Sequence, residues 1–250
     1  GRRVVAALDH PFLTPTGWKN AGDLGAGDVL QVPPRMSWVS AHTPDTMRHR
    51  LAGYLVGDGM CRGKVVVTNG DPDVCDDVYL IGEKLGLSVL TRPNGNPNER
   101  GDQSWNLVMT NGSVDLARAW GLYGHTAHTK RIPEFVMRAN AEGAAAFLGA
   151  YFACDGHIND TKFRSLSLEL ASVNRALMED TQHLLARLGI HGRLAEKRTT
   201  YNGRPYTSYA IYIRKTGGDA ARFCSIVGPH VRHSKKAARL ADWLAKFGGA

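Results

Sequence analysis

The sequence has few cysteines, no long apolar run and no visible signal peptide, and these absences narrow the class of protein. Its four cysteines among 250 residues form no Cys-x-x-Cys pair. They are too few for a disulfide scaffold and predict a reducing, cytoplasmic setting. The longest apolar stretch, residues 144–154, is well short of the ~20 residues that span a bilayer. Membrane insertion is therefore excluded, and no membrane partner is expected.

Several common functional signatures are also missing. The sequence contains no glycine-rich phosphate loop and no Gly-x-Ser-x-Gly turn, which argues against a P-loop nucleotide hydrolase and a serine hydrolase. The histidine pairs His125/His128 and His230/His233 have no cysteine or carboxylate close by in sequence. They therefore do not complete a zinc set.

The sequence does carry an excess of basic charge, and this excess is unevenly spread. There are 31 Lys and Arg residues against 23 Asp and Glu, a net charge of +8. From residue 191 onward there are 12 basic and 3 acidic residues, whereas the first 190 residues are nearly neutral. Such an excess favours a polyanionic partner, and nucleic acid is the main candidate. Taken alone, the basic patch also fits a solvated face or contact with a membrane surface.

The spacing of Gly, Pro and apolar residues predicts an α+β protein in three parts. Residues 1–34 have the pattern of short strands and turns, and 35–45 that of a linker. Two halves follow, 46–140 and 141–250. Helices are predicted over 46–56, 71–85, 113–120, 141–154 and 173–188 and from 218 and 233, with strands over 64–68, 88–92, 105–110, 163–170, 194–200 and 206–214. Residues 58–64 are predicted to form a turn.

The two halves repeat the same short segments in the same order. LVGDG, ending at Gly59, matches FACDG, ending at Gly156. KLGLSVL then matches RLGIHGRL, WNLVM matches YAIYI, and HTKR matches HSKK. Four matches in one order predict two equivalent halves related by a pseudo-two-fold axis.

The repeated segments LAGYLVGDG (51–59) and LGAYFACDG (148–156) are apolar helices rich in small residues. Glycine costs ~1 kcal/mol relative to alanine inside a helix, so Gly53 and Gly57 need a structural reason. They stand four residues apart on one face, as do Ala150 and Cys154. This spacing predicts that the two helices pack in close contact.

An aspartate stands at the end of each of these helices, Asp58 in the first and Asp155 in the second. A carboxylate is unfavourable beside the negative end of a helix dipole, and two together are worse unless a cation lies between them. Mg²⁺ prefers oxygen ligands and is often held by one or two carboxylates with phosphate oxygens. The pair therefore predicts a metal site that acts on phosphate esters.

Both segments resemble the motif of the LAGLIDADG homing endonucleases in their two-motif, single-chain form, and the resemblance covers about residues 48–247. It implies a pseudo-two-fold pair of αββαββα halves that bind a long asymmetric site on double-stranded DNA as a monomer. It also implies metal binding by Asp58 and Asp155 with the backbone of Gly57 and Cys154, using Mg²⁺ or, in its place, Mn²⁺. The sequence departs from the motif at three positions: Val56 and Ala153 replace the usual Asp, and Ala150 replaces a usual Gly.

The lysines provide a second match to intein-borne members of this family. The block KRIP, which starts at Lys130, resembles a K-x-I-P block in which the lysine is catalytic. A lysine near the scissile phosphate stabilises developing charge or orients the attacking water. The repeat nominates Lys235 as the equivalent catalytic residue, with Lys236 a near-equal choice.

The N-terminal block ALDHPFLTPTGWKNAGDLGAGD resembles part of the Hint-type splicing domain of inteins. His10 stands at the family's histidine position, and Ala7 replaces the usual Thr. No splice nucleophile precedes the block and no terminal His-Asn ends the chain, so the expectation is a splicing-fold remnant followed by a homing endonuclease. The alternatives are a DNA-binding or maturase-type module that has lost cleavage, and a protein-splicing element.

The hairpin predicted around Asn202-Gly203 is rich in basic and hydroxyl side chains. In the major groove, Arg favours guanine and Asn favours adenine. By alternation Tyr209, Ile211 and Ile213 are expected to face the core, leaving the other face for DNA. The residues predicted to contact DNA are Arg62, Lys64, Asn106, Lys162, Arg164, Arg198, Asn202, Arg204, Tyr206, Ser208, Tyr212, Arg214 and Lys236.

Overall fold

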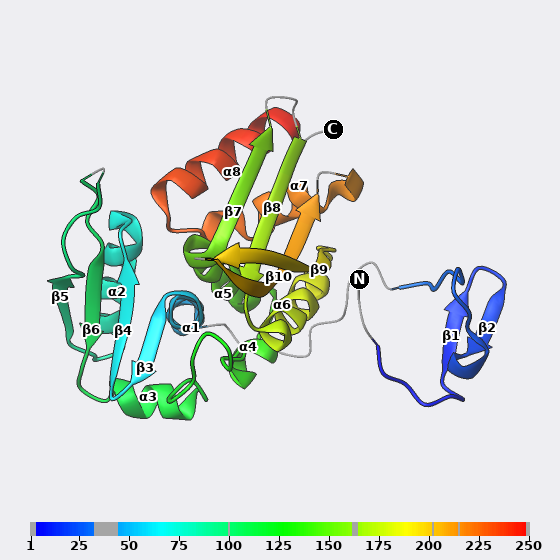
Figure 1. Ribbon diagram of the computed structural model, residues 1–250, viewed down its shortest axis with the longest axis horizontal. Helices are drawn as coiled ribbons and strands as arrows, with labels where there is room; N and C mark the ends of the chain where they lie inside the picture. Colours follow the sequence, from blue (N-terminus) through cyan, green and yellow to red (C-terminus); the bar gives the residue numbers. More distant parts are fainter. Residues whose placement is uncertain are drawn as a thin grey trace.

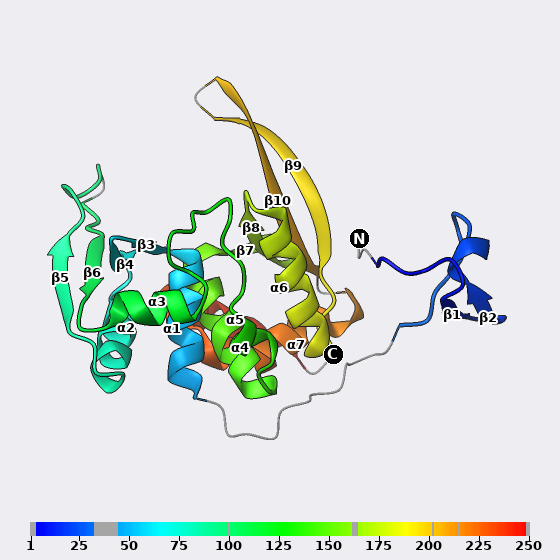
Figure 2. The same ribbon diagram turned by 90° about the horizontal axis from the view of Figure 1, so that it is seen from below.

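The computed structural model describes residues 4–32, 45–99, 101–161, 165–201, 203–214 and 216–248 (Figure 1). An N-terminal segment holds β1 (Pro11–Thr14), β2 (Gly17–Asn20) and a 3-10 turn, η1 (Ala21–Asp23). The antiparallel β1–β2 hairpin lies apart from the other elements in both views (Figures 1 and 2). Most of the predicted linker falls outside the described residues.

Each half contains the order of elements that the family resemblance implies, although the strands at residues 59–62 and 156–161 were not predicted from the residue pattern. The first half comprises α1 (Thr46–Gly57), β3 (Gly59–Arg62), β4 (Lys64–Asn69), α2 (Pro72–Lys84), β5 (Val89–Pro93), β6 (Trp105–Met109) and α3 (Ser113–Ala119), and α4 (Glu134–Met137) follows. The second comprises α5 (Ala141–Asp155), β7 (Gly156–Thr161), β8 (Ser165–Ser172), α6 (Arg175–Arg187), β9 (Arg193–Tyr201), β10 (Arg204–Arg214), η2 (Thr216–Gly218), α7 (Asp219–Ile226), η3 (Gly228–His230) and α8 (Ser234–Phe247). The αββαββα pattern of the two halves is confirmed.

The sheets of the two halves have the same topology. The strand orders are β3-β4-β6-β5 and β7-β8-β10-β9, all antiparallel. The prediction of a turn over residues 58–64 was wrong, because β3 occupies most of that span. Its only buried side chain is Cys61, so the apolar alternation is too short to signal a strand, and pairing with β4 is what makes it one.

Helices α1 and α5 lie side by side between the two sheets (Figures 1 and 2) and form the centre of one hydrophobic core. A Cβ atom added at Gly53 would lie 2.5 Å from the Phe147 carbonyl oxygen and 2.8 Å from Ala150 Cβ. One added at Gly57 would lie 2.5 Å from Cys154 Cβ. These separations are too short for real atoms, so glycine is required and the predicted close packing is confirmed.

The β9–β10 hairpin corrects one prediction about which side chains share a face. Its register pairs Arg198 with Thr207 and Ile211 with Leu194, and directly paired residues lie on the same face of a sheet. Arg198 therefore lies on the same face of the sheet as Tyr209 and Ile211. Alternation of side chains continued through the turn predicts the opposite face for it, with Tyr212 and Arg214. The turn does not preserve that count.

Within the described residues, none of the helices is long and apolar enough to cross a membrane. All four cysteines are unpaired.

Replacing Gly53 by alanine is expected to destabilise the protein by about 1–3 kcal/mol, because the added methyl group overpacks the helix contact. This loss would occur although alanine is the better helix former. The urea midpoint measures the change. Gly228→Ala is the control, since its added Cβ would meet only Leu240 Cβ at 3.9 Å. Equal midpoints for the two variants would contradict this account of the helix contact.

Two histidines packed against glycines of α5 are expected to make stability depend on pH. Burial lowers the pKa of His49, beside Gly143, and of His230, beside Gly149, below the ordinary 6.5. In the unfolded chain both take up protons near that ordinary pKa, so the unfolded state binds more protons as pH falls below about 6.5, and stability decreases there. The urea midpoint should drop between about pH 7.5 and about pH 5.5, and less so in the His49→Gln/His230→Gln double variant.

Candidate functional site

The two motif helices bring Asp58 and Asp155 to the same end of the core. The Asp58 amide caps α1 by donating to the Tyr54 carbonyl oxygen at 2.9 Å. One Asp58 carboxylate oxygen accepts from Asn69 Nδ2 at 2.6 Å, which holds this side chain against β4. Asp155 is the last residue of α5 and is exposed to solvent. The predicted convergence of the two aspartates follows from the close contact between Gly57 and Cys154.

The protein environment and the neighbouring carboxylate both make Asp155 harder to ionise. The pKa of Asp155 is raised from 3.8 to about 7, first because the surrounding protein removes hydration and second because of the negative charge of Asp58. Lys130 and Lys236 act in the opposite direction. A carboxylate that keeps solvent access and yet resists ionisation beside another carboxylate is typical of a cation site.

Two lysines cap the ends of the motif helices. Lys130 Nζ donates to the carbonyl oxygens of Leu55, Val56 and Gly59 at 2.8, 3.1 and 2.6 Å. Burial lowers the pKa of Lys130, which the two aspartates oppose. Its side chain, only 4% exposed, thus satisfies carbonyl groups that α1 leaves open and places a positive charge at the negative end of its dipole.

Lys236 occupies the equivalent position in the second half. Its Nζ donates to the carbonyl oxygens of Phe152, Ala153 and Cys154 at 3.2, 2.6 and 3.1 Å. Lys235 is exposed and makes no hydrogen bond or ion pair within the described residues. The repeat partner of Lys130 is therefore Lys236, which corrects the predicted pairing with Lys235. The side chain of Lys236 is thus placed at the end of α5, and its predicted contact with DNA stays a prediction.

The donor atoms at this site suit a hard cation. Within the described parts of the chain no group of three or more His, Cys, Asp and Glu side chains could hold a metal ion. Two carboxylates would therefore need backbone carbonyls, water or phosphate oxygens to complete the coordination. The Cys154 carbonyl accepts from Lys236 and retains a second lone pair. An oxygen-only set with several water positions fits Mg²⁺ better than zinc or copper.

Each sheet has an outer face, opposite the face that packs on the core. In the first half Val65, Val67, Leu107 and Met109 are buried against helices, so alternate residues lie on the outer face. The predicted DNA-contact residues Arg62, Lys64 and Asn106 lie there. Arg92, which sequence reasoning missed, joins them because it pairs with Asn106.

The outer face of the second sheet carries Ser208, Tyr212 and Arg214, as predicted. Arg193 and Lys197 also lie on this face because their partners are Tyr212 and Ser208. Arg193 stacks over the Tyr212 ring, 5.7 Å from its centroid. Both basic residues are identified by the register of the β9–β10 hairpin. The sequence pattern alone misses them, because counting alternate residues through the turn gives the wrong register.

The remaining predicted residues are placed as follows. The β9–β10 hairpin projects beyond the body of the second half (Figure 2), with Tyr206 exposed on it and Arg204 at the start of β10. Lys162, Arg164 and Asn202 lie outside the described residues. His10 precedes β1 and stacks edge-on against Phe12. The β1–β2 hairpin lies apart from α1 and α5 in both views (Figures 1 and 2).

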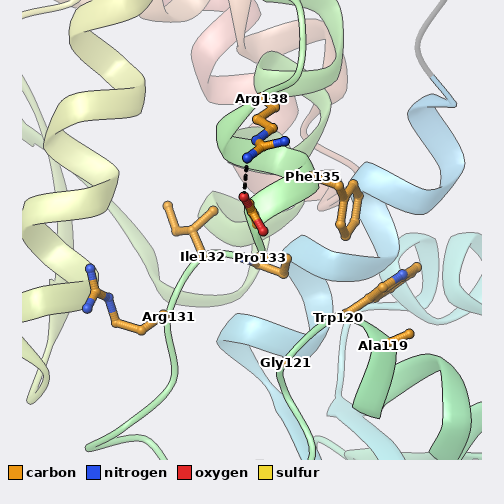
Figure 3. A pocket seen from close by; sticks show the side chains of 9 residues that line it. Ala119, Trp120, Gly121, Arg131, Ile132, Pro133, Phe135 and Arg138 are labelled. Atoms are coloured by element: carbon orange, nitrogen blue, oxygen red, sulfur yellow. Dashed lines mark ion pairs between the residues drawn. The ribbon is translucent and has the colours of Figure 1, made fainter.

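A surface cavity of about 510 Å³ lies elsewhere, between the end of α3 and α4 (Figure 3). Its lining includes Trp120, Phe135 and Arg131, together with Arg138 and Glu134, which form an ion pair along α4. Neither Asp58 nor Asp155 lines this cavity. The aspartate pair instead lies at the ends of α1 and α5.

The family model of the LAGLIDADG-like domain matches residues 142–228. The chain is 29% identical to the replicative DNA helicase DnaB of Rhodothermus marinus, over 98% of this chain and 27% of that protein. It is 29% identical to the replication factor C small subunit of Methanocaldococcus jannaschii, over 85% of this chain and 11% of that protein. It is 30% identical to RecA of Mycobacterium tuberculosis, over 76% of this chain and 25% of that protein. The chain thus spans about a quarter or less of these relatives.

Among solved structures, mesophilic variants of the homing endonuclease I-DmoI match with a TM-score of 0.53 and 16% identity, over 79% of this chain and 97% of that one. The structure of I-DmoI in complex with DNA and Ca matches with a TM-score of 0.53 and 15% identity, over 78% of this chain and 96% of that one. Full-length DUF199/WhiA from Thermatoga maritima matches with a TM-score of 0.53 and 12% identity, over 83% of this chain and 62% of that one. The chain therefore has an α+β fold of the LAGLIDADG type, with a LAGLIDADG-like domain in its second half.

Proposed function

We propose that this protein is a metal-dependent, site-specific endonuclease that hydrolyses both strands of duplex DNA. The observation that carries the proposal is the carboxylate pair Asp58 and Asp155, held at abutting helix ends between two sheets of identical topology. Basic residues on both outer faces extend a DNA-binding surface to either side. Structures of the similar fold of I-DmoI in complex with DNA and a divalent metal support this reading.

The residues at the helix ends divide the work between binding the cation and keeping its site in shape. In the proposed enzyme, Asp58 and Asp155 hold Mg²⁺, which supplies activation of water and stabilisation of the leaving oxygen. The Asn69 amide fixes the orientation of Asp58. All three protons of the Lys130 ammonium are engaged by carbonyl oxygens, so this lysine acts through its charge and by positioning α1. Lys236 does the same for α5.

We further propose that the chain derives from an intein. The curated relatives are a replicative DNA helicase, a replication factor C small subunit and a RecA protein, three differently named proteins of which the chain matches only a minor part. An element inserted into unrelated host genes accounts for such a pattern. The N-terminal hairpin with His10 would then be a remnant of the Hint-type splicing domain, and the break in an intein-less gene would promote copying of the intein.

A second candidate is a DNA-binding module that does not cut. The likeness to DUF199/WhiA, at the same TM-score as I-DmoI, favours it. The carboxylate pair and both lysine caps favour the nuclease, because a pure binding protein has no need for two adjacent carboxylates beside DNA phosphates. Binding of specific DNA without cutting in Mg²⁺ would select the second candidate.

Replacing either aspartate is expected to abolish cutting while leaving specific binding largely intact. Asp58→Asn and Asp155→Asn each remove one charge from the metal site, and a loss on the order of 100-fold or more in cutting rate is expected. The substrate is a randomised duplex library incubated with Mg²⁺, whose cut ends are sequenced. The control is Asp115→Asn, a carboxylate on α3 that is exposed and pairs only with Arg118. Cutting at the wild-type rate by either site variant would refute the metal assignment.

The two neighbouring lysines of α8 are expected to behave differently. Lys236→Met leaves the α5 carbonyls unsatisfied and should lower stability by about 1–3 kcal/mol, with a matching loss of cutting. Lys235→Met at the exposed neighbouring position should change stability by less than about 0.5 kcal/mol. Urea titration and the library cutting assay measure both. An equal effect of the two changes would rule out the cap role of Lys236.

A further inference from the structure

An apolar row crosses the outer face of the first sheet, where polar side chains are expected. The row consists of Met60, Val66, Val108 and Leu90, one from each strand, joined by direct pairing in the order β3-β4-β6-β5. Met60 and Leu90 at its two ends are 43% and 48% exposed. Helices α1, α2 and α3 pack on the opposite, core face of this sheet. Val66 is only 3% exposed and Val108 is half-buried, so the open apolar surface of the row lies at its two ends, Met60 and Leu90.

The neighbouring rows of the same face are polar. On the side toward the metal site, Thr68 pairs with Asn106 and Asn106 with Arg92, and the Thr68 amide donates to the Asp58 carbonyl oxygen at 3.2 Å. On the other side Arg62 pairs with Lys64. Successive rows are roughly 7 Å apart, about two steps of ~3.4 Å along a DNA strand. The face presents hydrogen-bonding, apolar and basic chemistry in sequence as it leaves the metal site.

The second sheet has different chemistry at the equivalent position. Its corresponding row consists of His157, Glu169, Tyr212 and Arg193, joined by the same pairing order. Glu169 also forms an ion pair with Lys197, with 2.7 Å between Glu169 Oε1 and Lys197 Nζ. The same topology therefore folds with a polar and charged row at this place. The fold does not require apolar side chains there, so the apolar row of the first half has another cause.

We propose that the apolar row is a specificity element that recognises thymine 5-methyl groups in the major groove of the half-site bound by the first half. The thymine methyl is the one apolar group that a base pair presents in that groove. The basic pair Arg62 and Lys64 on one side and Arg92 on the other suit flanking phosphates, which makes duplex DNA the fitting occupant. The second half reads its equivalent base pairs by hydrogen bonds. This inference rests on the proposed DNA-binding function and names what that surface selects.

Replacing thymine by uracil tests the inference without altering the protein. Wild-type protein in EDTA selects duplexes from a randomised library, and the selected sequence is resynthesised with deoxyuridine at one thymine at a time. Each contacted methyl group should contribute roughly 3- to 10-fold in affinity. We expect such losses at one or two positions of one half-site and no change in the other half-site. A library copied with deoxyuridine throughout should also select a different consensus in that half-site only.

Variants of the exposed end of the row assign the effect to its residues. Leu90→Gln, at a site 48% exposed, and Val108→Thr, which keeps the side-chain shape, should each abolish the difference between thymine and uracil. Tyr212→Phe in the equivalent row of the second sheet is the matched control, and should retain that difference. Specific binding with equal affinity for thymine and uracil at every position overturns this inference alone. Failure to select any sequence overturns both the inference and the proposed function.

Discussion

The contact between α1 and α5 is the constraint on which the remaining structure depends. Gly53 and Gly57 let the two backbones approach so closely that no other residue fits at either position. This contact joins the cores of the two halves, aligns the two helix ends and determines how far apart Asp58 and Asp155 lie. The proposed cation site and the proposed binding surface on both sides of it both depend on this one packing interaction.

The close approach also creates an electrostatic problem, and the structure offsets it locally. Two helix dipoles end together at two carboxylates, which is unfavourable without positive charge. Lys130 and Lys236 supply that charge from within the protein, each through three carbonyl oxygens. The two lysines do not fully offset the effect of burial and of Asp58 on Asp155, because the pKa of Asp155 is still raised to about 7. This remaining unfavourable interaction between the carboxylates is one that a divalent cation, as proposed above, would relieve.

The sequence alone predicted the parts of this arrangement that depend on local pattern. Small residues at Gly53, Gly57 and Ala150 indicated the helix contact, and the repeated Asp-Gly pairs indicated the carboxylates. Features set by pairing across the sheet were missed. The side assigned to Arg198 was wrong because hairpin register is determined by hydrogen bonds across the turn. The lysine equivalent to Lys130 is Lys236 and not Lys235. Lys130 lies in a loop and Lys236 in a helix, so aligning the two sequence segments did not align the positions of their side chains.

The first turn of α8 is held by the first half of the chain as well as by the second. Asp71 caps the start of α2, and its carboxylate also accepts from the Ser234 hydroxyl at 2.6 Å and the Ser234 amide at 3.3 Å. Lys236 lies one helical half-turn further on, so this long-range anchor aligns the cap of α5. On a ribosome, α8 emerges after every other element described here. The three carbonyl oxygens at the end of α5 therefore gain their lysine cap only once α8 has docked against both halves.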